Sequence, residues 1–298
     1  YYTQTYIINQ QYFKNLLISS SLTLLLFGCK TTSSIKSDSE TPTAPVIESN
    51  LTFEDVTPPY KYIFIRLYNP IYKNPFYIAN LLKGGIKITQ IDDIEVSHAS
   101  INFSLDDEFY GIALRKGKQL AKESCTDSEA DEYMEKCRAD ESEQITYAIR
   151  VSEEEFNNTK KFIEEYAELD EITYDTFINF KMAAFSIKRK FLTAKAKRQF
   201  GKIEYKKTKD EDRKEFDPHY VVNNFVCSTF IAYALNKNIA SVNQWFNEHL
   251  VNYRYVNVGD LPNIPGVQKL FFSTWEDYLD TAETFVENNP EFKQYLKN

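Results

Sequence analysis

Cys227 is the residue whose type and position best suit nucleophilic chemistry. It lies within residues 223–235, NNFVCSTFIAYAL, a pattern that predicts the first turns of a buried helix. Asn224 is a suitable N-cap, and capping there would place Cys227 in the first turn. Free amide N–H groups and the positive end of the helix dipole favour a thiolate at that position. The position of Cys227 in the first turn therefore predicts that its thiol acts as a nucleophile.

A structural interpretation of Cys227 starts from the same helix. Cys227, Ile231, Ala234 and Leu235 share one face at helical spacing, so the thiol is expected to point inward along an apolar stripe. A cysteine in such a stripe is often only a small core residue. A large distance between the thiol and any histidine would favour this interpretation.

Strands and helices that could position the thiol alternate along the chain. Aromatic and β-branched residues predict strands at 60–68, 96–103, 109–114, 144–151, 253–258 and 267–272. Helices are predicted at 75–83, at 174–200 and near the C-terminus. A capping box formed by Ser152 and Glu155 predicts the start of a further helix. The order predicts an α+β fold with a mostly antiparallel sheet and the nucleophile helix packed against it.

The predicted helix at 174–200 alternates apolar positions with a basic face. Such a helix can lie on a membrane surface, but a solvated outer face is the more common case and is what we expect here.

Composition excludes several classes of function. The formal net charge is -8, which argues against a nucleic-acid-binding surface. No glycine-rich loop follows a strand, so a nucleotide site is not predicted. Cys125 and Cys137 lie in a charged segment, 116–143, without histidine or a CxxC pair, so no metal or other cofactor is expected. These two cysteines could form a disulfide or remain free.

The N-terminal residues have the pattern of an exported protein. Residues 1–28 are predicted to be a signal peptide, because their apolar run is shorter than the roughly 20 residues of a membrane span. The ending LFGC resembles a bacterial lipobox, in which Cys29 would be lipidated, although Phe27 is larger than usual there; a simple anchor helix is the alternative. Residues 29–55 read as a flexible linker and 56–298 as the folded domain. The predicted location is the bacterial cell envelope, with a lipid anchor in the membrane.

Three segments resemble the circularly permuted papain-like (NlpC-type) cysteine hydrolases. They are residues 97–101 (SHASI), 114–116 (LRK) and 225–235 (FVCSTFIAYAL), and they are most similar to the YiiX/YaeF-like amidases. The resemblance implies a permuted papain-like fold, with Cys227 as nucleophile and His98 as general base and acid. His98 precedes the cysteine by 129 residues, the order of the permuted group.

The resemblance also implies a polar group that orients the imidazole, on the strand after the histidine strand. Tyr110 and Gly111 occupy those positions, and neither is a carboxylate or an amide. Glu108 is close in sequence but falls in the predicted turn, so we do not assign it. Among the other histidines, His219 could pass near the site and His249 is expected to be structural.

The sequence therefore predicts an envelope cysteine hydrolase that cleaves an amide, peptide or related acyl bond. The implied substrates are a peptidoglycan peptide or a lipid-linked acyl group. The alternative is an inactive papain-like binding module, which the missing orienting group would explain.

Overall fold

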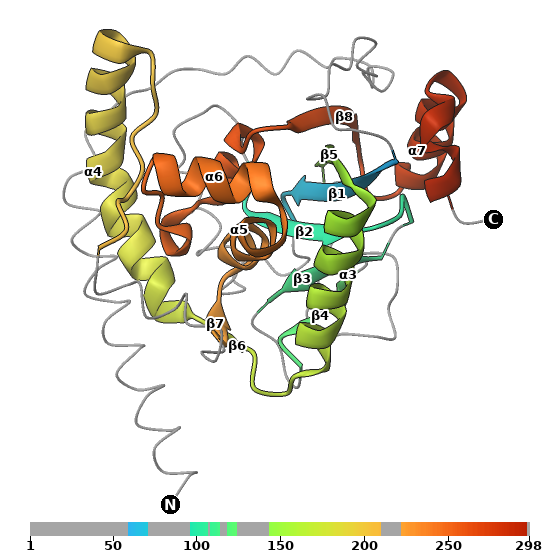
Figure 1. The fold of residues 1–298 in the computed structure, drawn as a ribbon, viewed down its shortest axis with the longest axis horizontal. Coiled ribbons are helices and arrows are strands. Elements are labelled where there is room, and N and C mark those ends of the chain that lie inside the picture. Colours follow the sequence, from blue (N-terminus) through green and yellow to red (C-terminus); the bar gives the residue numbers. More distant parts are fainter. Residues whose placement is uncertain are drawn as a thin grey trace, which may run out of the picture. The chain divides into compact units, whose positions relative to one another are not determined.

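The computed structural model describes residues 59–70, 96–106, 108–113, 118–123, 143–209 and 222–296 (Figure 1). Within them lies a six-stranded sheet of spatial order β4-β3-β2-β1-β5-β8, in which every neighbouring pair is antiparallel. Its strands are β1 (Tyr60–Tyr68), β2 (His98–Asn102), β3 (Phe109–Ile112), β4 (Leu120–Glu123), β5 (Gln144–Ser152) and β8 (Val267–Ser273). The α+β class and the mostly antiparallel sheet are confirmed.

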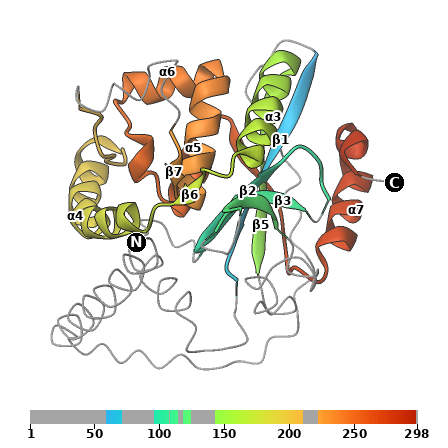
Figure 2. The same ribbon diagram turned by 90° about the horizontal axis from the view of Figure 1, so that it is seen from below.

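The sheet separates two hydrophobic cores. Along β1, Ile63 and Leu67 belong to one core, whereas Tyr62 and Phe64 belong to the other, because successive side chains of a strand point to opposite faces. Helices α3 and α5 cover the first face and α7 covers the second (Figure 2). The helices are α3 (Glu153–Glu168), α4 (Thr176–Phe200), α5 (Cys227–Asn238), α6 (Ala240–Glu248) and α7 (Tyr278–Asn288).

Short elements complete the described chain. Two-residue strands β6 (Thr173–Tyr174) and β7 (Asn224–Phe225) pair in parallel. The 3₁₀ turns are η4 (Tyr253–Tyr255), η5 (Val258–Asn263) and η6 (Pro290–Tyr295). None of the helices in the described part of the chain is long and apolar enough to cross a membrane.

Several local predictions are confirmed. The capping box at the start of α3 is present, with the Glu155 N–H donating to Ser152 Oγ and the Glu155 carboxylate accepting from the Ser152 N–H. The helix predicted at 174–200 is α4, which begins at Thr176 because the Asp175 side chain accepts from the Ile178 N–H at 2.8 Å.

One local prediction is wrong. Residues 253–258 do not form a strand: they turn through η4, since the Asn252 side chain accepts from the Arg254 N–H, and the Val256 carbonyl accepts from Ser228 Oγ. The strand β4, in the charged segment 116–143, was not among the predicted strands, and it pairs with β3.

Some predictions fall outside the described residues. These are the signal peptide at 1–28, the lipidated Cys29, the linker at 29–55 and the helix at 75–83. Cys125, Cys137 and His219 also lie outside them.

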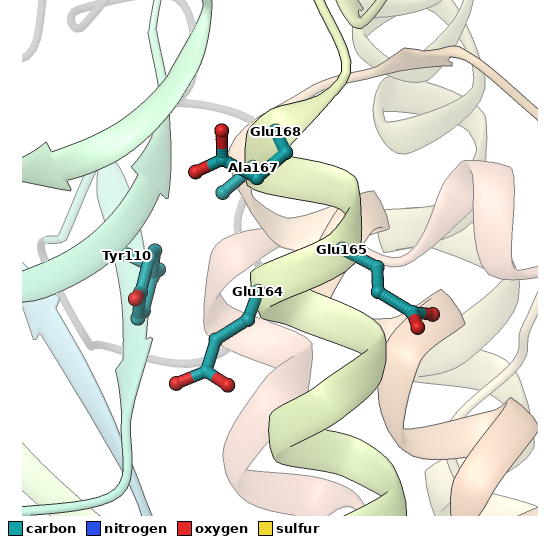
Figure 3. Close-up of a pocket in the computed structure, with 5 residues that line it drawn as sticks. All are labelled: Tyr110, Glu164, Glu165, Ala167 and Glu168. Carbon is teal, nitrogen blue, oxygen red and sulfur yellow. The ribbon is translucent and has the colours of Figure 1, made fainter.

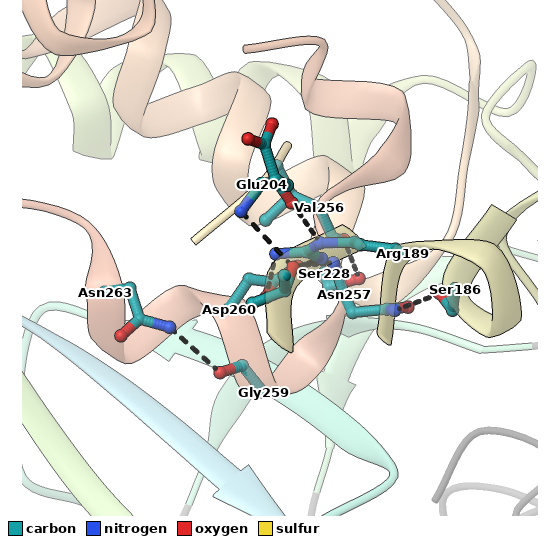
Figure 4. A network of polar contacts seen from close by, with 10 residues as sticks. Ser186, Arg189, Glu204, Ser228, Val256, Asn257, Gly259, Asp260 and Asn263 are labelled. Atoms are coloured by element: carbon teal, nitrogen blue, oxygen red, sulfur yellow. Dashed lines mark hydrogen bonds and ion pairs between the residues drawn. The ribbon is translucent and has the colours of Figure 1, made fainter. Parts of the chain in front are cut away.

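A buried ion pair attaches α4 to η5 (Figure 4). Arg189 donates from Nη1 and Nη2 to the two oxygens of Asp260 at 2.5 and 2.9 Å, and from Nε to the Glu204 carbonyl. Beside this pair, Asn257 Nδ2 donates to Ser186 Oγ at 2.8 Å. The inner face of α4 is therefore fixed by a bidentate charge pair with little access to water.

Asp260→Asn should destabilise the fold, because it leaves the Arg189 charge buried without its counter-ion. We expect the free energy of unfolding in urea to fall by about 3–5 kcal/mol. The exposed pair of Lys161 and Glu165, 3.8 Å apart, provides the control. Lys161→Gln should change the same quantity by less than about 0.5 kcal/mol. Equal losses in the two variants would contradict the assigned role of the buried pair.

Candidate active site

Helix α5 begins at Cys227 itself. Asn224 is not the N-cap, contrary to the sequence prediction: it lies in β7, where its side chain bonds to Thr173 of β6. The N-cap is Val226, whose N–H donates to Thr229 Oγ1 at 2.9 Å. Cys227 is thus the first helical residue, where the backbone N–H groups have no partner within the helix.

Helix α5 is buried along most of its length. All residues from Cys227 to Asn236 are buried, including the predicted apolar stripe. Ser228 Oγ donates to the Val256 carbonyl at 2.7 Å, so this hydroxyl serves the backbone. The thiol of Cys227 is free of any disulfide.

The structure brings His98 to this thiol. His98 is the first residue of β2 and pairs with Tyr68 of β1, whose ring meets the imidazole edge-on at 4.9 Å. The imidazole is hydrogen-bonded to the Cys227 side chain and, through Nε2, to Glu123. The large separation expected for a purely structural cysteine is not observed.

Glu123, on β4, supplies the orienting carboxylate that was not identified from the sequence. Its Oε2 lies 2.9 Å from His98 Nε2 and accepts from the Tyr68 hydroxyl at 2.8 Å. The carboxylate is fully buried. Cys227, His98 and Glu123 therefore form a row in which the imidazole lies between the sulfur and the carboxylate.

Gly111 explains how a carboxylate two strands away reaches the imidazole. It lies on β3, between β2 and β4, paired with Ser100 and Ala121. A Cβ at position 111 would lie 2.1 Å from Glu123 Oε2. Glycine has no side chain that could orient the imidazole, and the absence of that side chain is what admits the Glu123 carboxylate.

The charges in the row favour a protonated imidazole. Burial alone would lower the pKa of His98, but the negative charges of Glu123 and Cys227 outweigh it and raise the pKa to about 10. The protonated imidazole lies beside the Cys227 side chain, whose negative charge is one of the causes of the raised pKa of His98.

A hydroxyl group also lies near the thiol. Tyr174 of β6 is paired with Phe225 two residues before Cys227, and its ring packs against Val226. Asn179 Nδ2 donates to the Tyr174 hydroxyl at 2.8 Å. Burial and the charge of Cys227 raise the pKa of Tyr174, so the hydroxyl keeps its proton beside the sulfur. No sequence signal identified this residue.

The second described histidine is not part of this arrangement. His249 is exposed at the C-terminal end of α6, and its Nδ1 lies 3.0 Å from the Trp245 carbonyl. The expectation that His249 is structural agrees with this position.

A pocket of about 410 Å³ lies between β3 and α3 (Figure 3). Glu164 and Glu168 point toward the Tyr110 ring, whereas Glu165 points away from it. The remaining lining residue is Ala167, so Cys227, His98 and Glu123 do not line this pocket. We therefore do not assign it to the chemistry of the thiol.

Glu123→Gln should change how stability depends on pH. The pKa of His98 is about 10 in the folded protein and about 6.5 in an unfolded chain. A raised pKa stabilises the fold fully below about pH 6.5, and this contribution is lost as the pH approaches 10. The stability difference between parent and variant in urea should thus be largest near pH 6.5 and shrink toward pH 10. The exposed Glu165→Gln is the control, and a difference independent of pH would contradict the ion pair.

Gly111→Ala should displace the Glu123 carboxylate, because the added methyl overlaps it. We expect the pKa of His98, followed by NMR of the imidazole nitrogens, to fall toward its ordinary value, with a loss of about 1–3 kcal/mol in unfolding free energy. Gly201→Ala is the matched control, since Gly201 has φ 64° and open space around it. That variant should be strained without moving the His98 resonance. An unshifted resonance in Gly111→Ala would contradict the proposed path of the carboxylate.

Comparison of the chain with protein-family models, with curated proteins and with solved structures finds no match. The geometry of Cys227, His98 and Glu123 is therefore the basis for assigning a function.

Proposed function

We propose that this protein is a cysteine hydrolase that cleaves an amide, peptide or related acyl bond. The observation that carries the proposal is the position of His98, hydrogen-bonded on one side to the Cys227 thiol and on the other to the Glu123 carboxylate. Nucleophile, base and orienting group come from three different elements, and together they have the geometry expected of an activated thiol. The same arrangement supports the resemblance to permuted papain-like hydrolases.

Each group has a distinct role in the proposed reaction. The Cys227 thiolate attacks the acyl carbon, and the protonated His98 donates its proton to the leaving amine or alcohol as the bond to the acyl group breaks. The neutral imidazole then takes a proton from water, whose oxygen attacks the thioester and releases the acid and the thiolate. Glu123 holds the ring in position and stabilises its cationic form through both steps.

The negative oxygen of the tetrahedral intermediate needs donors beside the sulfur. The N–H of Cys227 is available at the helix N-terminus, where the helix dipole also favours negative charge. We assign the Tyr174 hydroxyl as a second donor: Asn179 already donates to its oxygen, so its proton can point toward the reacting group. Tyr174 lies in β6 and Cys227 begins α5, so the backbone holds both donors in place before substrate binds.

The alternative of an inactive binding module is less well supported by the structure. That interpretation rested on the absence of an orienting group, and Glu123 provides one from β4. A module that only binds ligand would have no need of a buried carboxylate paired with an imidazole beside a thiol.

The proposed setting is the bacterial cell envelope. We retain export by residues 1–28 and lipidation of Cys29 as proposals, together with an envelope substrate, either a peptidoglycan peptide or a lipid-linked acyl group. Both substrates carry an acyl bond suited to attack by a thiolate.

Alkylation of Cys227 by iodoacetamide should be rapid below pH 7 and should depend on His98. We expect His98→Ala to slow labelling near pH 6 by roughly 10²-fold or more, and Glu123→Gln to slow it to an intermediate degree. Mass spectrometry of the peptide containing Cys227 separates this thiol from those of Cys29, Cys125 and Cys137. If the alkylation rate follows the pH dependence of an ordinary thiol in the parent, His98→Ala and Glu123→Gln, Cys227 is not an activated nucleophile.

Turnover distinguishes the hydrolase from the binding module. With p-nitrophenyl acetate, the parent should form an acetyl adduct on Cys227 that then disappears by hydrolysis, and Cys227→Ala, which should keep the fold, should form none. Incubation with peptidoglycan fragments and with N-acylated lipids, followed by mass spectrometry, then identifies the substrate class. A persistent adduct, or no adduct, would favour the binding module.

A further inference from the structure

Helix α4 is strongly basic in an acidic protein. The chain carries a net charge of -8, yet α4 contains no aspartate or glutamate. Its basic residues are Lys181, Lys188, Arg189, Lys190, Lys195, Lys197 and Arg198. Arg189 is buried against Asp260, and the others are exposed. The surface of α4 is therefore a concentrated positive patch.

Large apolar side chains lie exposed among these charges. Phe177 is 65% exposed, Phe191 77% and Leu192 43%, and Phe200 at the end of the helix is 70% exposed. Scattered single apolar residues are common on surfaces, but three phenylalanines on one helix are unusual for a solvated outer face. The sequence-based preference for a purely solvated face does not explain them.

Some of the exposed apolar and basic residues share one side of the helix, which we call the outer face of α4. Its members recur at helical spacing: Phe177, Lys181, Lys188, Phe191, Leu192 and Lys195. The Lys181 ammonium lies 4.5 Å from the centre of the Phe177 ring, so charge and ring are adjacent. Phenylalanine, leucine and lysine are the residues with which proteins contact acyl chains and anionic headgroups at a membrane surface. In α4 these residues lie on one shared face, because the opposite side of the helix is buried in the protein.

The helix cannot rotate to bury this face. Its opposite side is occupied by the buried Met182, Ser186, Arg189 and Thr193, and the Arg189–Asp260 ion pair fixes it to η5 (Figure 4). Turning the outer face inward would break this buried pair. The apolar side chains are thus held toward the outside by the fold.

We propose that the outer face of α4 docks on an anionic lipid bilayer, with Phe177, Phe191 and Leu192 entering the acyl boundary. Lysines beside them would meet the negative headgroups, each adding to the attraction within a Debye length. Docking of two outer faces on each other is disfavoured, because both would present the same positive charge. This inference stands on α4 alone and does not depend on the proposed hydrolase activity.

Docking in this way would also bring the thiol site toward lipid. Tyr174 precedes α4 by two residues, and Asp175 caps the helix between them. The first turn of α4, which includes Phe177, therefore begins beside the residues that surround Cys227.

Collisional quenching by brominated lipids tests the orientation directly. Phe191→Trp places a fluorophore on the outer face, and Leu279→Trp on α7, where Leu279 is 48% exposed, is the matched control. Both are made in the full chain, and the native Trp245 and Trp275 signals are taken from the parent. With vesicles of brominated phosphatidylcholine and phosphatidylglycerol, we expect strong quenching for Phe191→Trp and little for Leu279→Trp.

The dependence of vesicle binding on the lysine charges provides a second test. In Phe191→Trp, adding Lys181→Gln, Lys188→Gln and Lys195→Gln, or raising the salt concentration, should weaken vesicle binding by about tenfold or more. Vesicles of phosphatidylcholine alone should quench weakly. Equal quenching at the two positions, or none at 191, would overturn the proposal, even if the N-terminal segment carries the chain to the vesicle.

Two further experiments distinguish lipid from two other possible partners of the outer face, nucleic acid and a second copy of the chain. Binding of a labelled oligonucleotide that the three glutamine substitutions abolish, without quenching by lipid, would assign the face to nucleic acid. Self-association in sedimentation that Phe191→Ser abolishes, again without quenching, would assign it to a second copy. Either result would overturn the lipid proposal.

Discussion

The buried carboxylate of Glu123 is the constraint on which the candidate site depends. A carboxylate removed from water is stable only when charge and hydrogen bonds replace its hydration. His98 and the Tyr68 hydroxyl provide these contacts, so β1, β2 and β4 must keep one register across β3. The same requirement keeps the imidazole cationic beside the Cys227 thiol. The buried Glu123 carboxylate thus constrains both the register of the strands and the protonation state of His98 beside the thiol.

Helix α4 joins the site to the surface of the molecule. Its first turn follows β6, which pairs with β7 directly before the nucleophile helix. Farther along, the Arg189–Asp260 pair holds it against η5. A buried bidentate pair has a narrow range of acceptable geometry, so it specifies the rotation of the helix as well as its position. That rotation explains why Phe177 and Phe191 remain exposed.

Much of the fold could be predicted because its signals are local. The alternation in β1, the capping box at Ser152 and the apolar residues of α5 each follow from side chains close together in sequence. The segments that were missed or predicted wrongly are short, or they make contacts that compete with their local preference. β4 has four residues, two of them charged, and residues 253–258 have the composition of a strand but are held in turns by Asn252 and Ser228. In both cases a tertiary contact outweighed local preference.

The sequence by itself determined the fold class, the strand that carries His98 and the buried helix that carries Cys227. Through the resemblance it also predicted that Cys227 and His98 act as a pair. Tertiary structure alone decided that Glu123 completes the row and that Tyr174 lies beside it. The physical reason is that Glu123 reaches His98 across Gly111 from a strand two positions away in the sheet. Sequence periodicity reports which face of a strand is buried, but it does not report which strand lies next to it or where a missing side chain opens a path.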